Sequence, residues 1–501
     1  MEKGEYEYDE VFINANIPII EYEKNTWKPV IRQTTICVGI WYMYFMQGLY
    51  LGAPTVLVAQ VRREANSTDA ISDEMSSWLS SMQVLSSMPI GLILPWLFHK
   101  IGRKYTYFIM CLFIFIGYVL FYTSTNVYHV LISQAFLGVS TAASNTFMPV
   151  MIAEYTTPKY RGIFLTFKNA STFWGIWISN AIGTYYYWKN IAIVSFVCSV
   201  YMLTVLAWPE SPTWLAMKGR YTESAKSHRW LKGVNKNSEK ELAYLIRLQK
   251  KTKTIPLSSN TLNMSCFHTV WTTVTSRHFY KPAVICLLLV SQYQFTGKLI
   301  ISIYAIEVLK SLTQNESVAY KAMLILDGVT VFSMYMGCII SRYFKRRTIM
   351  LIFTSSGISL LYIISLYLYL VALSIIQESH ILIILLLTGF SIAIGCGPVI
   401  LASTIYGEIV PSRYLTSITT LNGFNGTILM SVLLKLSPFM FKTLKMHGSF
   451  LLFAISSTVI LIILYIILPE TKDKTVQEIE EYFSEKQKPL ENSQTLLKRK
   501  K

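Results

Sequence analysis

The sequence lacks the usual marks of an enzyme. Its seven histidines are scattered, and no metal-ligand cluster, nucleophile triad or glycine-rich phosphate loop appears along it. The seven cysteines all fall in long apolar stretches or in the central polar segment, so no structural disulfide is indicated. We therefore expect no catalytic residue, no metal site and no cofactor.

The start of the chain also lacks the features of a cleavable signal peptide. Such a peptide begins with basic residues and passes quickly into a short apolar core, whereas residues 1–34 precede any long apolar run. We expect a cytosolic tail over 1–34, with the first membrane helix acting as its own signal anchor. Acidic side chains are frequent in this tail: Glu2, Glu5, Glu7, Asp9, Glu10, Glu21 and Glu23.

The chain does contain a large excess of apolar residues. Hydrophobic residues make up 52% of it and aromatic residues 14%, with a mean hydropathy of +0.41, which is more than a soluble core requires. About 20 apolar residues form a helix that crosses a hydrocarbon core of about 30 Å. We predict an all-α membrane protein whose twelve transmembrane helices lie near 35–58, 78–98, 105–124, 127–153, 163–186, 190–208, 281–306, 320–341, 348–370, 381–406, 415–436 and 448–468.

The net charge of +17 comes from basic residues that cluster in alternate short loops. This alternation is the positive-inside pattern, and it predicts that both termini lie in the cytosol. No aromatic–basic platform accompanies the charge, so we expect a lipid bilayer and no nucleic acid as the partner. The clusters are Lys100, Arg103 and Lys104, then Lys159 and Arg161, then Arg342, Lys345, Arg346 and Arg347.

Two glycosylation sequons fall in loops that the charge pattern places outside the cell. They begin at Asn66 and Asn315, and we predict that both asparagines are glycosylated.

The predicted helices fall into two halves of six. We expect an N-terminal bundle over 35–208, a cytosolic basic linker over 209–279, a C-terminal bundle over 280–468 and a cytosolic tail over 469–501. Leu242, Leu245 and Ile246 predict a short amphipathic helix in the linker.

Landmarks in the two halves repeat at a nearly constant offset. Pro-Glu motifs begin at Pro209 and Pro469, which are 469 − 209 = 260 residues apart. Glu154 and Glu408 are 254 apart, and Arg103 and Lys345 are 242 apart. This indicates an internal duplication, an architecture in which transporters bind solute at the midplane between two repeats.

Several short motifs occur in a fixed order along nearly the whole chain, at 76–81, 102–104, 154–162, 209–215, 407–411 and 469–475. Together they resemble the sugar porter family of the major facilitator superfamily, and within it the insect facilitated trehalose transporters. The resemblance implies a major facilitator fold of two six-helix bundles that carries a sugar by alternating access.

Carboxylates at cytosolic helix ends face basic residues of neighbouring loops, and such pairs can latch the two bundles together when the cavity is closed inside. Exposed ion pairs of ~0–1 kcal/mol would be weak enough to break during transport. The alternative is that the basic loops only set the topology. The latch candidates are Arg103, Glu154, Arg161, Arg346 and Glu408.

The resemblance also implies a sugar-binding cavity. Two aromatic platforms of the family are missing, because Ser403 and Gly423 stand where it has tryptophan. Losing hydrogen-bonding groups at ~1 kcal/mol each would change the specificity. The family's binding positions fall at Asn169, Gly175, Tyr293, Gln294, Gly297, Ser403 and Asn422.

Charged residues inside the predicted helices suggest further sites. Lys298 and Asp327 lie at similar depths and could form an intramembrane pair, either functional or merely structural. Lys168 and Lys435 are expected to extend to a membrane interface. Tyr50 stands where proton-coupled relatives carry Asp, which favours a uniporter.

We therefore expect a plasma-membrane glycoprotein that moves trehalose or glucose down its gradient. Two alternatives stay open: a transporter of a non-sugar small solute, and a membrane nutrient sensor that does not transport.

Overall fold

The computed structural model describes residues 12, 15, 17–18, 27–65, 71–254, 274–313, 315–410 and 414–472 of the 501. Within these residues every regular element is a helix. The predicted glycosylation site Asn66, nearly all of the two tails and linker residues 255–273 lie outside the described part.

The N-terminal half supplies the first six membrane segments. The first helix begins at Lys28 rather than at residue 35, because Pro29 at its start is well suited to the first turn. The segments are α2 (Lys28–Glu64), α3 (Asp73–Ile101), α4 (Arg103–Thr123), α5–η2–α6 (Val127–Ala142, Ala143–Phe147, Met148–Tyr155), α7 (Pro158–Tyr185) and η3–α8–η4 (Trp188–Asn190, Ile191–Met202, Leu203–Ala207).

The C-terminal half repeats this arrangement. Its segments are α13–α14 (Arg277–Phe295, Lys298–Ile303) followed by the short α15 (Ala305–Thr313), then α16 (Glu316–Tyr343), α17 (Arg346–Ala372), α18–α19 (His380–Cys396, Pro398–Ile409), α20 (Leu415–Thr443) and α21 (Lys445–Ile467).

The prediction of twelve membrane helices is confirmed. Eleven helical stretches of the described residues are long and apolar enough to cross a membrane. The twelfth is α7, a 28-residue helix whose apolar character is diluted by Lys168, Asn169 and Thr172, which line a cavity.

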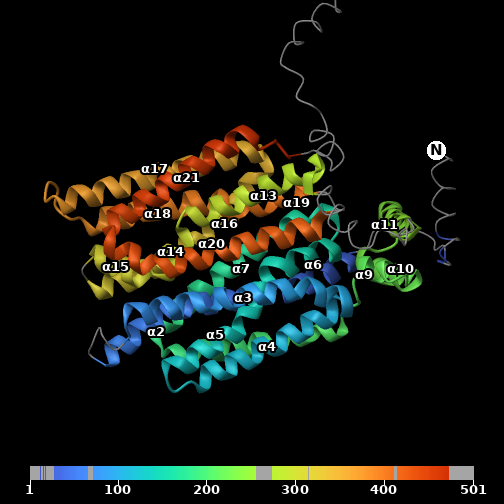
Figure 1. Ribbon diagram of the computed structural model, residues 1–501, viewed down its shortest axis with the longest axis horizontal. Coiled ribbons are helices and arrows are strands. Elements are labelled where there is room, and N and C mark those ends of the chain that lie inside the picture. The colour runs from blue at the N-terminus through green and yellow to red at the C-terminus, as the bar shows by residue number, and fades with distance from the viewer. Residues whose placement is uncertain are drawn as a thin grey trace, which may run out of the picture.

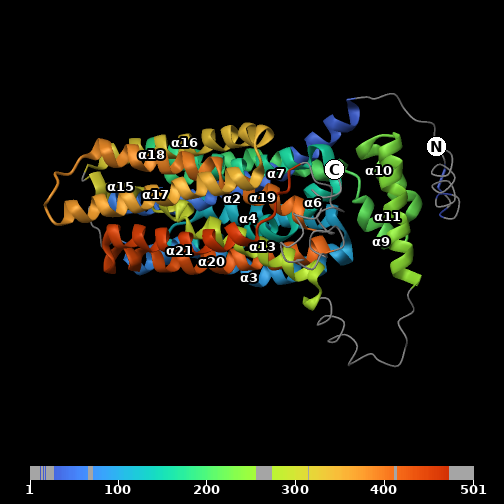
Figure 2. The ribbon, with the colours of Figure 1, turned by 90° about the horizontal axis from the view of Figure 1, so that it is seen from above.

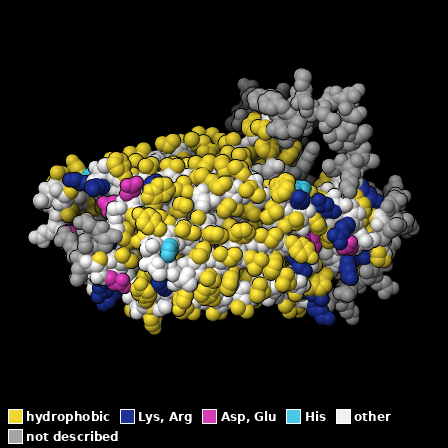
Figure 3. Space-filling view, turned by 60° about the horizontal axis from the view of Figure 1, so that its bottom comes forward, with side chains coloured by type: hydrophobic (Ala, Val, Ile, Leu, Met, Phe, Trp, Pro, Cys, Tyr) yellow, Lys and Arg dark blue, Asp and Glu magenta, His cyan; other side chains and the backbone are white. Residues whose placement is uncertain are grey.

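The two halves form two bundles that lie against each other (Figure 1). Helix α3 packs against α20 and α7 against α16, so these four helices form the seam between the bundles. Hydrophobic side chains cover the flank in Figure 3, while charged side chains gather toward the two ends. This is the surface expected of a protein whose flank faces lipid.

Three membrane segments are interrupted near the centre of the protein. The fourth contains the π-helical turn η2, the seventh breaks at Gly297, and the tenth breaks at Gly397 and Pro398. Gly297 adopts a left-handed φ of 71°, which glycine tolerates at little cost. Interrupted helices leave backbone groups unpaired, and in transporters they typically line the solute site.

The linker adds α9 (Pro212–Met217), α10 (Tyr221–Lys232) and α11 (Lys236–Thr254) at one end of the bundles, called here the linker end (Figure 2). The predicted amphipathic helix is confirmed as part of α11, where Leu242 and Ile246 are buried. A bidentate ion pair of Arg229 with Glu239, at 2.8 Å, holds α10 to α11.

Candidate functional site

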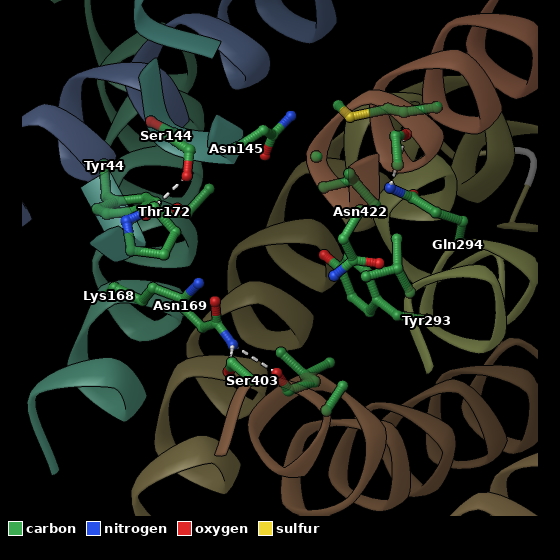
Figure 4. A pocket seen from close by; sticks show the side chains of 18 of the residues that line it. Tyr44, Ser144, Asn145, Lys168, Asn169, Thr172, Tyr293, Gln294, Ser403 and Asn422 are labelled. Atoms are coloured by element: carbon green, nitrogen blue, oxygen red, sulfur yellow. Dashed lines mark hydrogen bonds between the residues drawn. The ribbon is translucent and has the colours of Figure 1, made fainter. Parts of the chain in front are cut away.

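A cavity of about 180 Å³ lies between the two bundles near the helix interruptions. Its walls come from α2, η2 and α7 on the N-terminal side, and from α13, α14, α19 and α20 on the C-terminal side (Figure 4). Because both bundles contribute, any movement of one bundle against the other changes the shape of the cavity.

Five of the seven predicted binding residues line this cavity. They are Asn169, Tyr293, Gln294, Ser403 and Asn422. Asn169 donates hydrogen bonds to the Val399 carbonyl at 2.5 Å and to the Ser403 hydroxyl at 2.8 Å, so it joins α7 to α19 across the seam. The side-chain amide oxygen of Asn422 is buried without a hydrogen-bond partner in the described residues. It is therefore an acceptor that a solute could use.

The other two predicted binding residues do not line the cavity. A side chain at Gly175 would overlap the Phe45 carbonyl, so this glycine lets α7 approach α2 closely. Gly297 forms the break between α13 and α14, and an added Cβ would lie 2.8 Å from the Phe453 ring. Both glycines are packing positions in this structure.

The sequence reasoning missed several lining residues. On α2 they are Tyr44 and Gln47, on η2 Asn145, and on α7 Thr172. Residues three or four apart share one helix face, so the polar positions 44 and 47, or 168 and 172, could have revealed these faces.

Of the two lysines expected at a membrane interface, Lys168 lies elsewhere. Lys168 lines the cavity, with its ammonium 5.7 Å from the centre of the Tyr44 ring. Lys435 stands 3.7 Å over the Trp78 ring and so joins α20 to α3. The expectation for Lys168 was wrong because side-chain length alone does not say which way a helix face points, whereas for Lys435 it stays a prediction.

A second cavity, of about 650 Å³, opens at the end opposite the linker. Between the two cavities the Thr55 hydroxyl donates to the Ile303 carbonyl, which brings α2 against α14. Nearby, Arg62 pairs with Glu307 of α15 at 3.4 Å and with Asp73 at 3.2 Å. We call this set of contacts the outer gate; Thr55, Arg62, Ile303 and Glu307 all line the second cavity and bring the two bundles together there.

The predicted latch residues lie at the linker end, but their pairs form within each bundle. Arg103 pairs with Glu154 at 2.9 Å inside the N-terminal bundle, and Arg346 pairs with Glu408 inside the C-terminal one. Arg161 donates to the Ala153 carbonyl at 3.0 Å, and no carboxylate of the described residues pairs with it. Among the described residues each acidic helix end thus meets the loop of its own half, and a latch between the bundles stays a prediction.

The Pro-Glu motifs explain the repeat in structural terms. Glu210 accepts hydrogen bonds from the backbone N–H groups of Arg103 at 2.9 Å and Lys104 at 3.2 Å, at the start of α4. Glu470 does the same for Arg346 at 3.1 Å and Arg347 at 3.3 Å, at the start of α17. Each carboxylate thus caps a helix N-terminus.

These caps also correct the predicted register of the repeat. The counterpart of Arg103 is Arg346 rather than Lys345, an offset of 346 − 103 = 243. Burial raises the pKa of the Glu210 carboxyl, while the N–H donors of Ser211, Arg103 and Lys104 act in the opposite direction.

Lys298 and Asp327 lie close together but form no direct ion pair within the described residues. Both line a pocket of about 10 Å³, roughly the space of one water molecule. The Lys298 ammonium donates to the Ser391 hydroxyl at 2.9 Å. Asp327 accepts from the Asn180 amide of α7 at 2.7 Å, so the acid is bonded across the seam.

Of the two predicted glycosylation sites, Asn315 is described. It is exposed, and its carbonyl oxygen caps α16 by accepting from the N–H of Ser317 at 3.0 Å. It lies at the surface of the end opposite the linker.

Comparison with known proteins agrees with this architecture. The facilitated trehalose transporter Tret1 of Bombyx mori is 26% identical over 468 residues, which cover 91% of this chain and 86% of that protein. A second relative, Tret1 of Drosophila grimshawi, is 24% identical; the match covers 95% of this chain and 52% of that longer protein.

Solved structures show the same fold. The xylose transporter XylE, a proton:xylose symporter of the major facilitator superfamily solved with 6-bromo-6-deoxy-D-glucose, superposes with a TM-score of 0.73 at 16% identity, covering 91% of this chain and 99% of that one. Its inward-open form from E. coli gives 0.67 at 14% identity, covering 90% and 99%. The fold is thus that of the major facilitator superfamily. The family described as sugar (and other) transporter matches residues 31–483, and the chain belongs to that family.

Proposed function

We propose that this protein is a facilitative sugar transporter that carries trehalose or a hexose across the plasma membrane by alternating access. The observation that carries the proposal is the central cavity, which is lined by polar groups from both bundles. The names of its relatives, facilitated trehalose transporters, support the choice of sugar.

Recognition of a sugar needs donors and acceptors that are not already committed. The Asn422 carbonyl oxygen has no partner in the described residues, and Gln47 and Tyr293 bring further polar groups to the lining. Each hydrogen bond to a solute hydroxyl would contribute ~1 kcal/mol. Gln47 belongs to one bundle and the other two to the opposite bundle, so a bound sugar would bridge them.

Opening of the outer gate requires α14 and α15 to move away from α2. The contacts to be broken are the Thr55–Ile303 hydrogen bond and the partly exposed pair of Arg62 with Glu307. Such pairs are worth about 0–1 kcal/mol each, so solute binding can offset their loss. On the linker side, the bonds of Asn169 to α19 would break instead.

Tyr50 supports uniport. It is buried, its hydroxyl lies 2.9 Å from that of Ser133, and it is absent from the cavity lining. Basic residues at the linker end support a cytosolic position for that end and for both termini. The exposed Asn315 at the opposite end suits a glycosylated outer face.

The test is uptake of radiolabelled trehalose and glucose by frog oocytes expressing the chain, with and without a proton gradient. We expect saturable uptake that does not depend on the gradient. Asn422→Ala should lower uptake efficiency about fivefold, the equivalent of ~1 kcal/mol. Asn425→Ala is the matched control, since Asn425 lies on the same helix but outside the cavity lining. Surface expression without uptake of either sugar would contradict the proposal.

A further inference from the structure

The cavity contains one feature that a neutral sugar does not explain. Among all its lining residues Lys168 is the only charged one. The side chain belongs to α7 and lies on the same wall as Tyr44 and Asn169, across from Tyr293 and Asn422 (Figure 4). The solute space therefore carries one formal positive charge on its N-terminal wall.

No carboxylate of the described residues pairs with this lysine. Its ammonium lies 5.7 Å from the centre of the Tyr44 ring. The Tyr44 hydroxyl is committed to the Ser144 carbonyl at 2.8 Å, and the neighbouring Asn169 amide to α19. The contrast with Lys298 is informative, because that buried lysine shares its small pocket with Asp327.

An ammonium group at this depth in a membrane protein is costly unless an opposite charge accompanies it. A neutral sugar offers only hydroxyl dipoles, whereas an anionic solute would neutralise the charge while bound. The described lining residues include a single lysine and no arginine. Phosphate groups are typically bound by several donors, with arginine favoured for bidentate contact, so one compact ammonium fits a single carboxylate better.

We propose that the preferred solute is a monoanionic polyol, a sugar acid whose carboxylate pairs with Lys168 and whose hydroxyls reach Tyr293 and Asn422 on the opposite wall. This inference rests on the proposed transport function and narrows its substrate class. The solute carboxylate would pair with Lys168 on the N-terminal wall, while the solute hydroxyls would bind the C-terminal wall. The bound solute would thereby draw the two bundles together across the cavity.

The experiment compares glucuronate with glucose, which share the same ring and differ only at the exocyclic carbon, a carboxylate in one and a hydroxymethyl group in the other. In oocytes under voltage clamp, we expect glucuronate to compete with labelled sugar at a concentration at least about tenfold lower than glucose, because hydrogen bonds to charged groups are the stronger ones. Its uptake should move one negative charge per molecule. Lys168→Gln should abolish this preference and Lys168→Arg should retain most of it.

Lys321→Gln is the matched control, since Lys321 is an exposed lysine of α16. If glucose and glucuronate are carried equally well and Lys168→Gln changes neither, the sugar-acid proposal fails while sugar transport stands. If neither sugar is bound or carried by protein at the cell surface, the transport proposal fails with it.

A second measurement keeps the inference testable if Lys168→Gln does not fold. Purified wild-type protein is heated with glucuronate, glucose, glucose 6-phosphate or sodium chloride at one ionic strength. Stabilisation by glucuronate well above that by the other three supports the proposal. Equal stabilisation by glucose, or by chloride alone, overturns it, and a larger effect of glucose 6-phosphate would overturn the choice of a carboxylate.

Discussion

The linker ends of the two bundles are built from the same parts but differ in burial. In the N-terminal bundle the Arg103 and Glu154 side chains are only 2% and 8% exposed, whereas Arg346 and Glu408 are 20% and 29% exposed. Ser211 adds a hydrogen bond to Glu154 at 2.6 Å. Both halves contain the helix cap, made by Glu210 in the first and Glu470 in the second. Only the ion pair of the first half is enclosed.

The difference indicates that the N-terminal network is structural and the C-terminal one is easier to rearrange. Breaking a buried pair leaves an uncompensated charge, which costs far more than losing a partly exposed one. A rocking motion would therefore disturb the second half more readily than the first.

The largest effect is expected for Arg103→Ala. Removing this guanidinium strands Glu154 in a buried site, which should lower the free energy of unfolding by about 3–5 kcal/mol. The measurement is thermal unfolding of the purified protein in detergent, followed by tryptophan fluorescence. Lys100→Ala, at an exposed neighbouring position, serves as the control and should change little. Equal small shifts for both variants would show that the pair is not enclosed.

The linker helices should make the stability of the folded protein sensitive to pH, because α10 contains the buried His228. Burial, followed by the nearby Lys232 ammonium, lowers the pKa of His228 from 6.5 to about 3. The unfolded chain therefore takes up a proton below pH 6.5 while the folded one does not. Above pH 6.5 His228 therefore does not reduce the free energy of unfolding. Below pH 6.5 this free energy should fall by about 1.4 kcal/mol per pH unit.

The measurement for this prediction is thermal unfolding between pH 7.5 and 5. His228→Gln should remove most of the slope in this window. A slope that persists in the variant would assign the effect to other groups.

A smaller contrast is expected between Ser211 and Thr471, which follow the two capping glutamates. Ser211 bonds Glu154 and also caps α9 by accepting from the Trp214 N–H at 3.3 Å. The Thr471 hydroxyl is buried without a partner in the described residues. Ser211→Ala should lower the free energy of unfolding by about 1–2 kcal/mol. Thr471→Ala, its matched control, should change it by no more than about 0.5 kcal/mol. The same thermal assay distinguishes them, and similar losses would argue that both hydroxyls serve alike.

The smallest effect is expected for Arg346→Ala, because Arg346 and Glu408 are partly exposed, unlike the enclosed pair of Arg103 and Glu154. We expect a loss of about 0–1 kcal/mol together with altered uptake rates, which separates this variant from Arg103→Ala. A loss of several kcal/mol would mean that the C-terminal pair is as structural as the first.

Much of the fold could be predicted from the sequence, because hydrophobic length, loop charge and repeated motifs act locally. The twelve membrane helices and the paired motifs of Arg103 and Glu154 depend on such signals. The direction in which a helix face points depends on packing with other helices, and this is why the sequence alone predicts a membrane interface for Lys168. Gly175 and Gly297 were assigned to binding for a similar reason: sequence position cannot separate a residue that lines a cavity from one that packs behind it.

In the outer gate, the contact between Thr55 and Ile303 constrains the residue type at one position more than at the other. Thr55 contributes a side-chain hydroxyl, but Ile303 contributes only its backbone carbonyl, which lies at the end of α14, where helical carbonyls lack partners within the helix. Many residue types at position 303 could therefore preserve this contact, whereas at position 55 a hydroxyl is required. Substitutions at position 303 would therefore be tolerated, whereas substitutions that remove the hydroxyl at position 55 would impair closure of the gate.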